Sequence, residues 1–281
     1  MRANYHTHCD FCDGKATAGA MAAAAHAAGY RVLGFSSHAP LPWWTDWCMQ
    51  PARLGDYVTE VRRLGREWAD RGLEVLLGLE IDWVDGETYP RHPRFADLDL
   101  DYRIGSVHYV SWGGAERFAV DESAEDLALH LQAAGGPPGR LWQEYYHNLS
   151  ALVAAGGFDI LGHFDVVRKN NAGGRYFSED DPAYLAAALG VAAQLQGTGI
   201  VVEVNTGGML RGKTVDPYPC LAVMKELCAR GVPVTICADA HAPEHFGPCL
   251  DAARERVRAA GYRSIAVLSG GVWREVGLDE T

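Results

Sequence analysis

Histidines and carboxylates recur at the ends of short apolar segments of this chain. The first pair is His6 and His8, which a single threonine separates. Residues two apart on a β-strand point to the same face, so both imidazoles would converge on one point and could share a metal ion. An isolated pair of this kind could equally be two stacked surface histidines, so the repetition along the chain decides between these interpretations.

The later apolar segments end in the same residue types. Those end residues are His38, Glu80, His108, His163, Asp239 and His241. In parallel α/β barrels the carboxyl ends of the strands form one face, and active sites are built there. We therefore expect six histidines and two carboxylates to meet in space although they are scattered in the sequence.

This set of side chains indicates a cluster of divalent metal ions. Imidazole and carboxylate ligands favour zinc, manganese or iron over calcium or magnesium alone. Six histidines are too many for one tetrahedral site, so two or three ions are expected. Glu80 could bridge two of them at the separation of about 3.5–4 Å that two-metal hydrolytic sites use.

The elements that must position these residues alternate between β-rich and helical patterns. Strands separated by helices indicate parallel βαβ units, and seven such repeats without a charge-rich linker predict one barrel-like α/β domain over residues 1–281. The expected strands are residues 4–8, 31–37, 74–80, 102–108, 159–163, 200–205 and 232–238. The clearest expected helices are residues 54–69, 183–195 (after a start at Asp181-Pro182), 218–229 and 250–260.

Two segments are less regular. Residues 135–139, Gly-Gly-Pro-Pro-Gly, are the only strong cluster of helix and strand breakers. We expect a loop there, because too few residues remain on either side for two independent βα domains. A weak strand at residues 264–268 could close or flank the barrel.

Composition excludes several classes of protein. The net charge of −11 disfavours nucleic-acid binding through a basic surface, although metal ions can reverse the local field for an anionic substrate. No apolar segment approaches the roughly 20 residues that span a bilayer, and Met1 leads directly into a polar segment. We expect a cytoplasmic protein with reduced cysteines and no membrane partner. The sequence carries no signal for the oligomeric state.

In this order, the candidate ligands resemble the polymerase-and-histidinol-phosphatase (PHP) superfamily of phosphoesterases. The resemblance runs from His6-Thr7-His8 to Ala238-Asp239-Ala240-His241, which is most of the chain. The segments FSSHAPLP, GLEIDW, GSVHYV, GHFDVVRK, VEVNTGG and DPYP look most like the monofunctional histidinol-phosphate phosphatases of histidine biosynthesis. The resemblance implies a distorted (β/α)7 TIM-like barrel with a trinuclear metal site at the carboxyl ends of its strands.

The resemblance also implies how the ligands divide among the ions. His6, His8, Glu80 and Asp239 would hold one ion, and Glu80 would bridge to a second ion held by His108 and His163. His38 and His241 would hold the third, with Asp13 from the loop after His8, where several relatives have a histidine. Cys9 and Cys12, which spell C-x-x-C in that loop, are then expected to be structural rather than redox-active.

The expected reaction is hydrolysis of a phosphate monoester, most specifically L-histidinol phosphate. A metal-bridging hydroxide would attack phosphorus, with Glu80 bridging the ions and Asp239 or a metal-bound water as the general acid. Arg168, Lys169 and Arg211 follow strand ends and are candidates to bind the phosphate, although solvated surface charge explains such residues nearly as well.

The roles of several other side chains can be interpreted in two ways from the sequence. Glu203 could accept a substrate amine or be internal to the barrel, and Asp165 could orient a ligand histidine or the substrate. The tryptophans after His38 could line the pocket or pack on the barrel mouth. The remaining histidines, namely His26, His92, His130, His147 and His245, are expected to be structural or exposed.

Three rival functions follow from the same residues. The metal ligands would be unchanged in a phosphoesterase acting on a nucleotide or another small phosphomonoester. A 3′-exonuclease is disfavoured by the acidic balance. A non-catalytic metal-binding module would bind metal without turnover, but every expected ligand position carries a competent residue.

Overall fold

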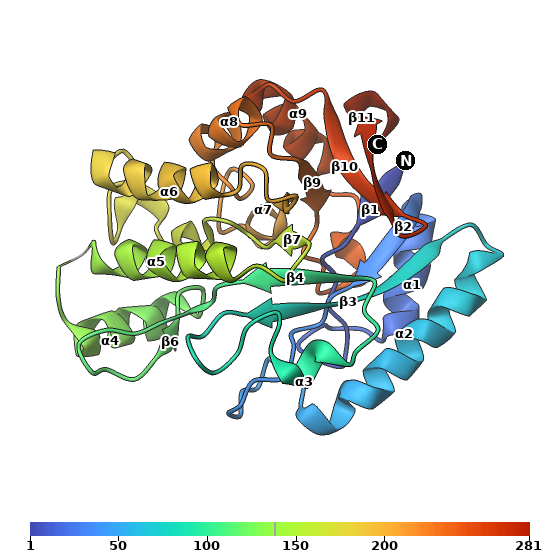
Figure 1. Ribbon diagram of the computed structural model, residues 1–281, viewed down its shortest axis with the longest axis horizontal. Helices are drawn as coiled ribbons and strands as arrows, with labels where there is room; N and C mark the ends of the chain where they lie inside the picture. Colours follow the sequence, from blue (N-terminus) through green and yellow to red (C-terminus); the bar gives the residue numbers. More distant parts are fainter. Residues whose placement is uncertain (138) are drawn as a thin grey trace.

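Seven parallel strands form the centre of the molecule, in the order β1-β2-β3-β4-β7-β8-β9 (Figure 1). The computed structural model describes residues 1–137 and 139–281, so Pro138 of the predicted loop lies outside the described residues. An isolated parallel bridge between Thr7 and Ala240 joins the two outer strands beyond their ends, and the sheet becomes a nearly closed barrel. The strands are β1 Arg2–Asn4, β2 Tyr30–Phe35, β3 Glu74–Asp82, β4 Tyr102–Ser106, β7 Ile160–Leu161, β8 Val201–Asn205 and β9 Val234–Cys237.

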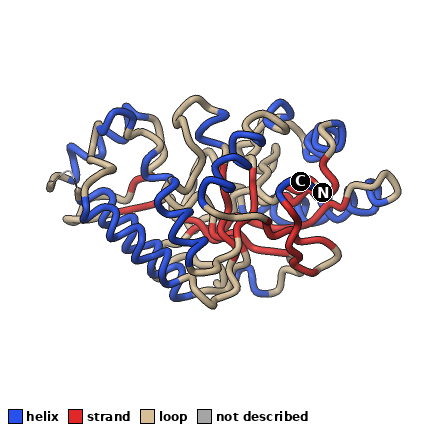
Figure 2. Tube along the Cα trace, turned by 90° about the horizontal axis from the view of Figure 1, so that it is seen from above, coloured by secondary structure: helices blue, strands red, loops and turns tan. Residues whose placement is uncertain are grey.

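Helices surround these strands, as two perpendicular views show (Figure 2). The predicted seven-stranded α/β barrel is confirmed, including its parallel strands. Within the described residues, no helix is long and apolar enough to cross a membrane. The helices are α1 Ala18–Ala27, α2 Leu54–Ala69, α3 Pro93–Ala96, α4 Ala124–Ala134, α5 Arg140–Ala155, α6 Pro182–Gln194, α7 Gly207–Leu210, α8 Leu221–Ala229 and α9 Leu250–Ala260.

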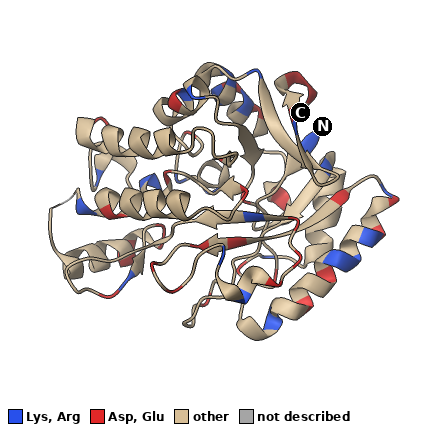
Figure 3. Ribbon diagram, viewed as in Figure 1, with Lys and Arg blue, Asp and Glu red and all other residues tan. Residues whose placement is uncertain are grey.

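Local sequence explains the two best predicted helices. In α2, the buried side chains recur at helical spacing from Tyr57 to Trp68 and pack against the barrel. Its outer face carries interspersed acidic and basic side chains, among which Arg63 pairs with Glu60 (Figure 3). The start of α6 is capped by Asp181, whose carboxylate accepts a hydrogen bond from the amide of Ala183.

The predicted bounds agree with the structure only in part. The first strand, expected at residues 4–8, is β1 Arg2–Asn4, so His6 and His8 lie beyond its end. The helix expected from residue 218 begins at Leu221, because Tyr218 pairs in extended conformation with Asn205 at the end of β8. The strand expected at residues 264–268 is confirmed as β10 Ser264–Ser269. Within the described residues it pairs with β11 Val272–Gly277 alone, in a separate antiparallel hairpin. It therefore flanks the barrel, which was one of the two expected arrangements. A second small hairpin, β5 Tyr109–Val110 with β6 Phe118–Ala119, follows β4.

Tyr102, which is 1% exposed, lies in a cluster of buried side chains from several strands that includes Tyr5, Val32 and Ile160. Its hydroxyl donates hydrogen bonds to the carbonyl oxygens of Tyr5 and Phe35, so the ring joins three strand regions. Glycines make room for this ring, since a Cβ atom at Gly34 or Gly78 would lie only 2.3 or 2.5 Å from its atoms. The packing of the barrel interior around Tyr102 thus depends on small residues at these positions.

The variant Gly78→Ala should lower the free energy of unfolding by about 1–3 kcal/mol, because the added methyl group forces the buried Tyr102 ring to move. Gly190→Ala is the matched control: Gly190 lies in α6, and open space surrounds the position of its added Cβ. This control should gain about 0.5–1 kcal/mol. Urea unfolding of both variants measures the difference, and equal stability would contradict the role given to Gly78.

Candidate metal centre

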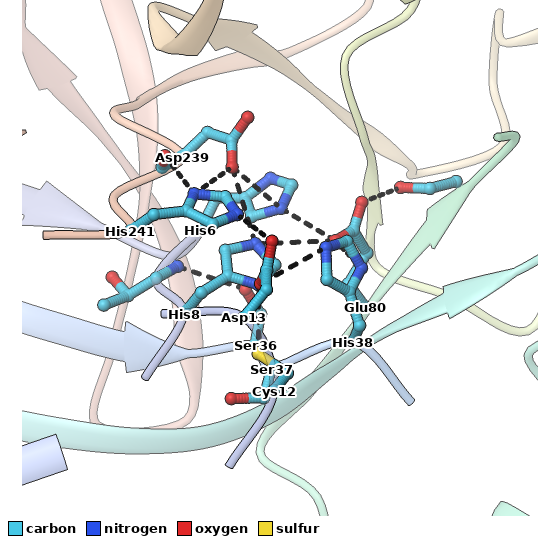
Figure 4. Close-up of polar contacts among 12 residues, drawn as sticks. His6, His8, Cys12, Asp13, Ser36, Ser37, His38, Glu80, Asp239 and His241 are labelled. Carbon is cyan, nitrogen blue, oxygen red and sulfur yellow. Dashed lines mark hydrogen bonds and ion pairs between the residues drawn. The ribbon is translucent and has the colours of Figure 1, made fainter. Parts of the chain in front are cut away.

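The predicted ligands converge at the carboxyl ends of the barrel strands (Figure 4). His6 and His8 follow β1, His38 follows β2, and Glu80 lies on β3. The remaining predicted ligands follow the later strands: His108 after β4, His163 after β7, and Asp239 and His241 after β9. Of these four side chains, only His241 is not buried.

Glu80 lies at the centre of this cluster and is 1% exposed. Its Oε2 atom lies 2.9 Å from His38 Nδ1 and 3.1 Å from His6 Nε2. Its Oε1 atom lies 2.9 Å from His163 Nε2 and 3.7 Å from His108 Nε2. The two oxygens therefore face different sets of histidines, which is the arrangement a bridging carboxylate requires.

The carboxylate of Asp239 faces His6 and His8, the two histidines that follow β1. Its Oδ1 atom lies 3.4 Å from His8 Nε2 and 3.8 Å from His6 Nε2. Arg211 holds the other oxygen at 2.8 Å through Nη2. The backbone of Asp239 adopts φ +51°, a left-handed conformation that non-glycine residues adopt rarely and that clusters at functional sites. The side chain is held from both sides, by the histidines and by Arg211.

Asp13, the predicted ligand from the loop after His8, also reaches the cluster. Its carboxylate oxygens lie 3.2 Å from His241 Nε2 and 3.9 Å from His38 Nε2. A tight turn orients it, because the amides of Cys12 and Gly14 both donate to the carbonyl oxygen of Cys9. The structure thus brings Asp13 together with the two histidines with which it was grouped.

The carboxylates and histidines shift each other's pKa. Burial alone would raise the pKa of Glu80, but the surrounding histidines, first His6 and His38, hold it well below its usual value. Burial opposes protonation of His6, yet Glu203 and Glu80 raise its pKa well above the usual value. Burial also opposes protonation of His108. The negative charges of Asp82 and Glu80 outweigh this effect and raise the pKa of His108 to about 10.

His8 behaves oppositely. Burial, together with the neighbouring His241 and His38, lowers its pKa to about 3. It is therefore a neutral imidazole at physiological pH, with a lone pair ready for a metal ion.

Several buried atoms of the candidate ligands lie near one another, but none of the described residues meets them in hydrogen-bonding geometry. Such orphaned atoms cost free energy unless another group satisfies them. Groups of candidate donors lie within 4.8 Å of one another, as metal coordination requires. The donor set therefore fits divalent metal ions. The orphaned atoms include His6 Nε2, His8 Nε2, His38 Nδ1, Glu80 Oε2 and Asp13 Oδ1.

Two further carboxylates orient ligand histidines from behind. Glu203 contacts His6 Nδ1 at 2.8 Å, and Asp82 contacts His108 Nδ1 at 2.7 Å. Such contacts fix the tautomer and leave Nε2 for the metal. Glu203, for which a substrate contact was one interpretation, is internal to the barrel and 0% exposed. Asp82 was missed, although its spacing of two from Glu80 on one strand was a usable signal.

A cavity of about 710 Å³ opens from the cluster. Of the three predicted phosphate-binding residues, Arg211 and Lys169 line it, together with Lys15 and Lys213, but Arg168 does not. Arg168 instead pairs with Glu179 at 2.7 Å, within a 3₁₀ turn after β7.

Asp165, which was expected to orient a ligand or the substrate, pairs with Arg168 at 3.3 Å and accepts from the amide of Cys220. Trp47 and His245 line the cavity. The positions of Asp165, Trp47 and His245 depend on the geometry of loops and turns, which the spacing of residues along strands does not predict.

Fold and site together define a metal-binding α/β barrel protein with its site at the carboxyl ends of the strands. Residues 4–207 match the PHP domain, and the chain belongs to this family. It is 32% identical over 265 residues to a "Probable histidinol-phosphatase" of Deinococcus radiodurans, covering 92% of this chain and 94% of that protein.

Two solved structures share the fold. The histidinol phosphate phosphatase (HISK) of Lactococcus lactis, solved with zinc, L-histidinol and phosphate, aligns with a TM-score of 0.69 and 20% identity, over 97% of this chain and 98% of its own. The hisK protein of Listeria monocytogenes aligns with a TM-score of 0.75 and 18% identity, over 89% of this chain and 99% of its own. The barrel predicted from the sequence is therefore the fold of these structures.

Metal binding should release protons. In the metal-free protein, His6 and His108 have raised pKa values and are protonated at neutral pH, so an ion must displace those protons to reach the lone pairs. Apparent zinc affinity should fall as pH is lowered from about 8 to about 6. Calorimetric titration in buffers of different ionisation enthalpy measures the proton release; a heat independent of the buffer would contradict it.

The variant Asp82→Asn should weaken metal binding by about 10- to 100-fold, because His108 loses the carboxylate that orients it. The exposed residue Asp85 lies on the following turn, and Asp85→Asn is the control. Competition with a chromogenic chelator compares the two variants. Unchanged affinity in Asp82→Asn would show that His108 is oriented without this contact.

Proposed function

We propose that this chain is a phosphoric monoester hydrolase, a histidinol-phosphatase of histidine biosynthesis that converts L-histidinol phosphate to L-histidinol and phosphate. The observation that carries the proposal is the buried histidine–carboxylate cluster, centred on Glu80, at the base of the cavity. The Deinococcus relative supports it through its name, and the Lactococcus structure supports it because that protein was solved with zinc, L-histidinol and phosphate. The cytoplasmic location expected from the sequence remains a prediction.

Two or three divalent ions, zinc, manganese or iron, would be held by the cluster. Glu80 would bridge two of them, because its oxygens face different histidines. When bound, such ions supply Lewis acidity, which activates water as a nucleophile and neutralises charge on the transferring phosphoryl group. The ligands would divide as the resemblance implies: His6, His8, Glu80 and Asp239; Glu80, His108 and His163; Asp13, His38 and His241.

The protein's own charges complement the two ends of this substrate. Lys15, Arg211 and Lys213 on the cavity wall attract a dianionic phosphate. Asp121 and Glu122 line the same cavity and offer acceptors for the ammonium and imidazole groups of a histidinol moiety. Asp121 is paired with Lys169 at 2.9 Å, so this wall also holds an ion pair that a cationic substrate can rearrange.

The testing experiment is phosphate release by zinc- or manganese-loaded protein from L-histidinol phosphate, beside nucleotides and sugar phosphates. We expect kcat/KM for L-histidinol phosphate to exceed the others by at least about 10²-fold, since lost polar contacts carry such discrimination. A preference for a nucleotide or another monoester would replace the substrate. No turnover of any compound would leave a metal-binding module.

Within the same assay, Glu80→Gln should lower kcat by about 10²-fold or more, because the neutral amide bridges metal ions poorly. The half-exposed Glu87 lies beyond the end of the same strand, and Glu87→Gln serves as the control. Circular dichroism verifies the fold of both variants. Full activity of Glu80→Gln would eliminate a bridging role for this carboxylate.

A further inference from the structure

His245 lies in the loop that follows the last barrel strand, β9, and contacts the backbone of the candidate metal ligand His241. It ends a short 3₁₀ helix, Pro243–His245. Its Nδ1 atom accepts a hydrogen bond of 3.2 Å from the backbone amide of His241. The backbone amide donor leaves no alternative for Nδ1, which must present its lone pair.

The proton arrangement of the ring follows from this contact. A neutral imidazole with an accepting Nδ1 carries its hydrogen on Nε2, so Nε2 is a hydrogen-bond donor. His245 is among the residues that line the cavity, as are Arg211, Lys213 and His241. The cavity wall thus carries a neutral hydrogen-bond donor in addition to cations that would attract a phosphate.

The backbone around His245 is anchored independently of any ligand. The amide of His245 donates to the carbonyl oxygen of Ala242 at 3.0 Å, and Ala242 is buried. The next residue, Phe246, is 6% exposed and packs edge-to-face against Tyr30 with ring centroids 5.5 Å apart. The direction of the imidazole is therefore set before a substrate arrives, which reduces the entropic cost of binding.

We infer that His245 is a substrate-binding residue whose Nε2–H donates a hydrogen bond to a phosphoryl oxygen of the phosphate monoester. This inference rests on the proposed function, since it needs a phosphate in the cavity. A donor placed against an anionic oxygen forms a charge-assisted hydrogen bond, which is stronger than one between neutral groups.

Two variants separate this role from a structural one. The amide of His245→Asn reaches the position of Nδ1 and can accept from His241, but nothing occupies the position of Nε2. The longer His245→Gln places its amide nitrogen near Nε2 and restores the donor. His147→Asn is the matched control, because His147 is exposed on α5 away from the cavity lining.

The measurements use metal-loaded full-length protein with p-nitrophenyl phosphate as substrate and inorganic phosphate as ligand. His245→Asn should lower kcat/KM and weaken phosphate binding by about 10- to 100-fold, with unchanged bound metal. His245→Gln should recover most of this loss, and His147→Asn should match the unmodified protein.

Three results would overturn the inference: unchanged phosphate binding in His245→Asn, an equal loss in both His245 variants, or a loss that follows reduced metal content. The last would mean that His245 only supports the His241 backbone. If the unmodified protein binds phosphate but hydrolyses no monoester, the proposed function fails, while the comparison of phosphate affinities still decides the role of His245.

Discussion

The buried carboxylate of Glu80 is the group on which the rest of the site depends. A charge that is removed from water costs several kcal/mol unless other groups compensate it. Here the compensation comes from histidines that follow other strands, among them His6, His38 and His163. Strand β3 can therefore carry an acid at this position because the nearly closed barrel brings these histidines around it. The same arrangement that makes the carboxylate tolerable collects enough lone pairs to hold metal ions.

Closure of the barrel decides which ligands face each other. The parallel bridge between Thr7 and Ala240 places their flanking residues on the opposite, inward face. His8 then stacks on His241, with ring centroids 4.0 Å apart, and His6 lies level with Asp239. One backbone bridge between the first and last strands thus aligns two pairs of ligands that lie more than 200 residues apart in the chain.

The barrel and the convergence of its strand-end histidines and carboxylates could be predicted from the sequence because both follow strand periodicity and order. The other features of the site depend on the conformation of short turns, which follows no repeating pattern in the sequence. Arg168 follows a strand as the ligands do, but a 3₁₀ turn directs it to Glu179 and away from the cavity. His245 enters the cavity through a similar short turn. Asp82 lies two residues after Glu80 on the same strand, as the spacing predicts. Its role in orienting a histidine becomes apparent only in the fold, where His108 from the next strand lies beside it.

The charge of the whole chain and the charge of the cavity act in different ways. The net charge of −11 is spread over the surface and disfavours polyanions such as nucleic acids. Inside the cavity, Lys15 and Arg211 lie close to the candidate metal ligands, and bound divalent ions would add further positive charge where a phosphate must enter. Asp121 and Glu122 line the same cavity. A cavity that combines both signs in this way would favour the proposed substrate, which has an anionic and a cationic end, over a simple phosphate ester of a neutral alcohol.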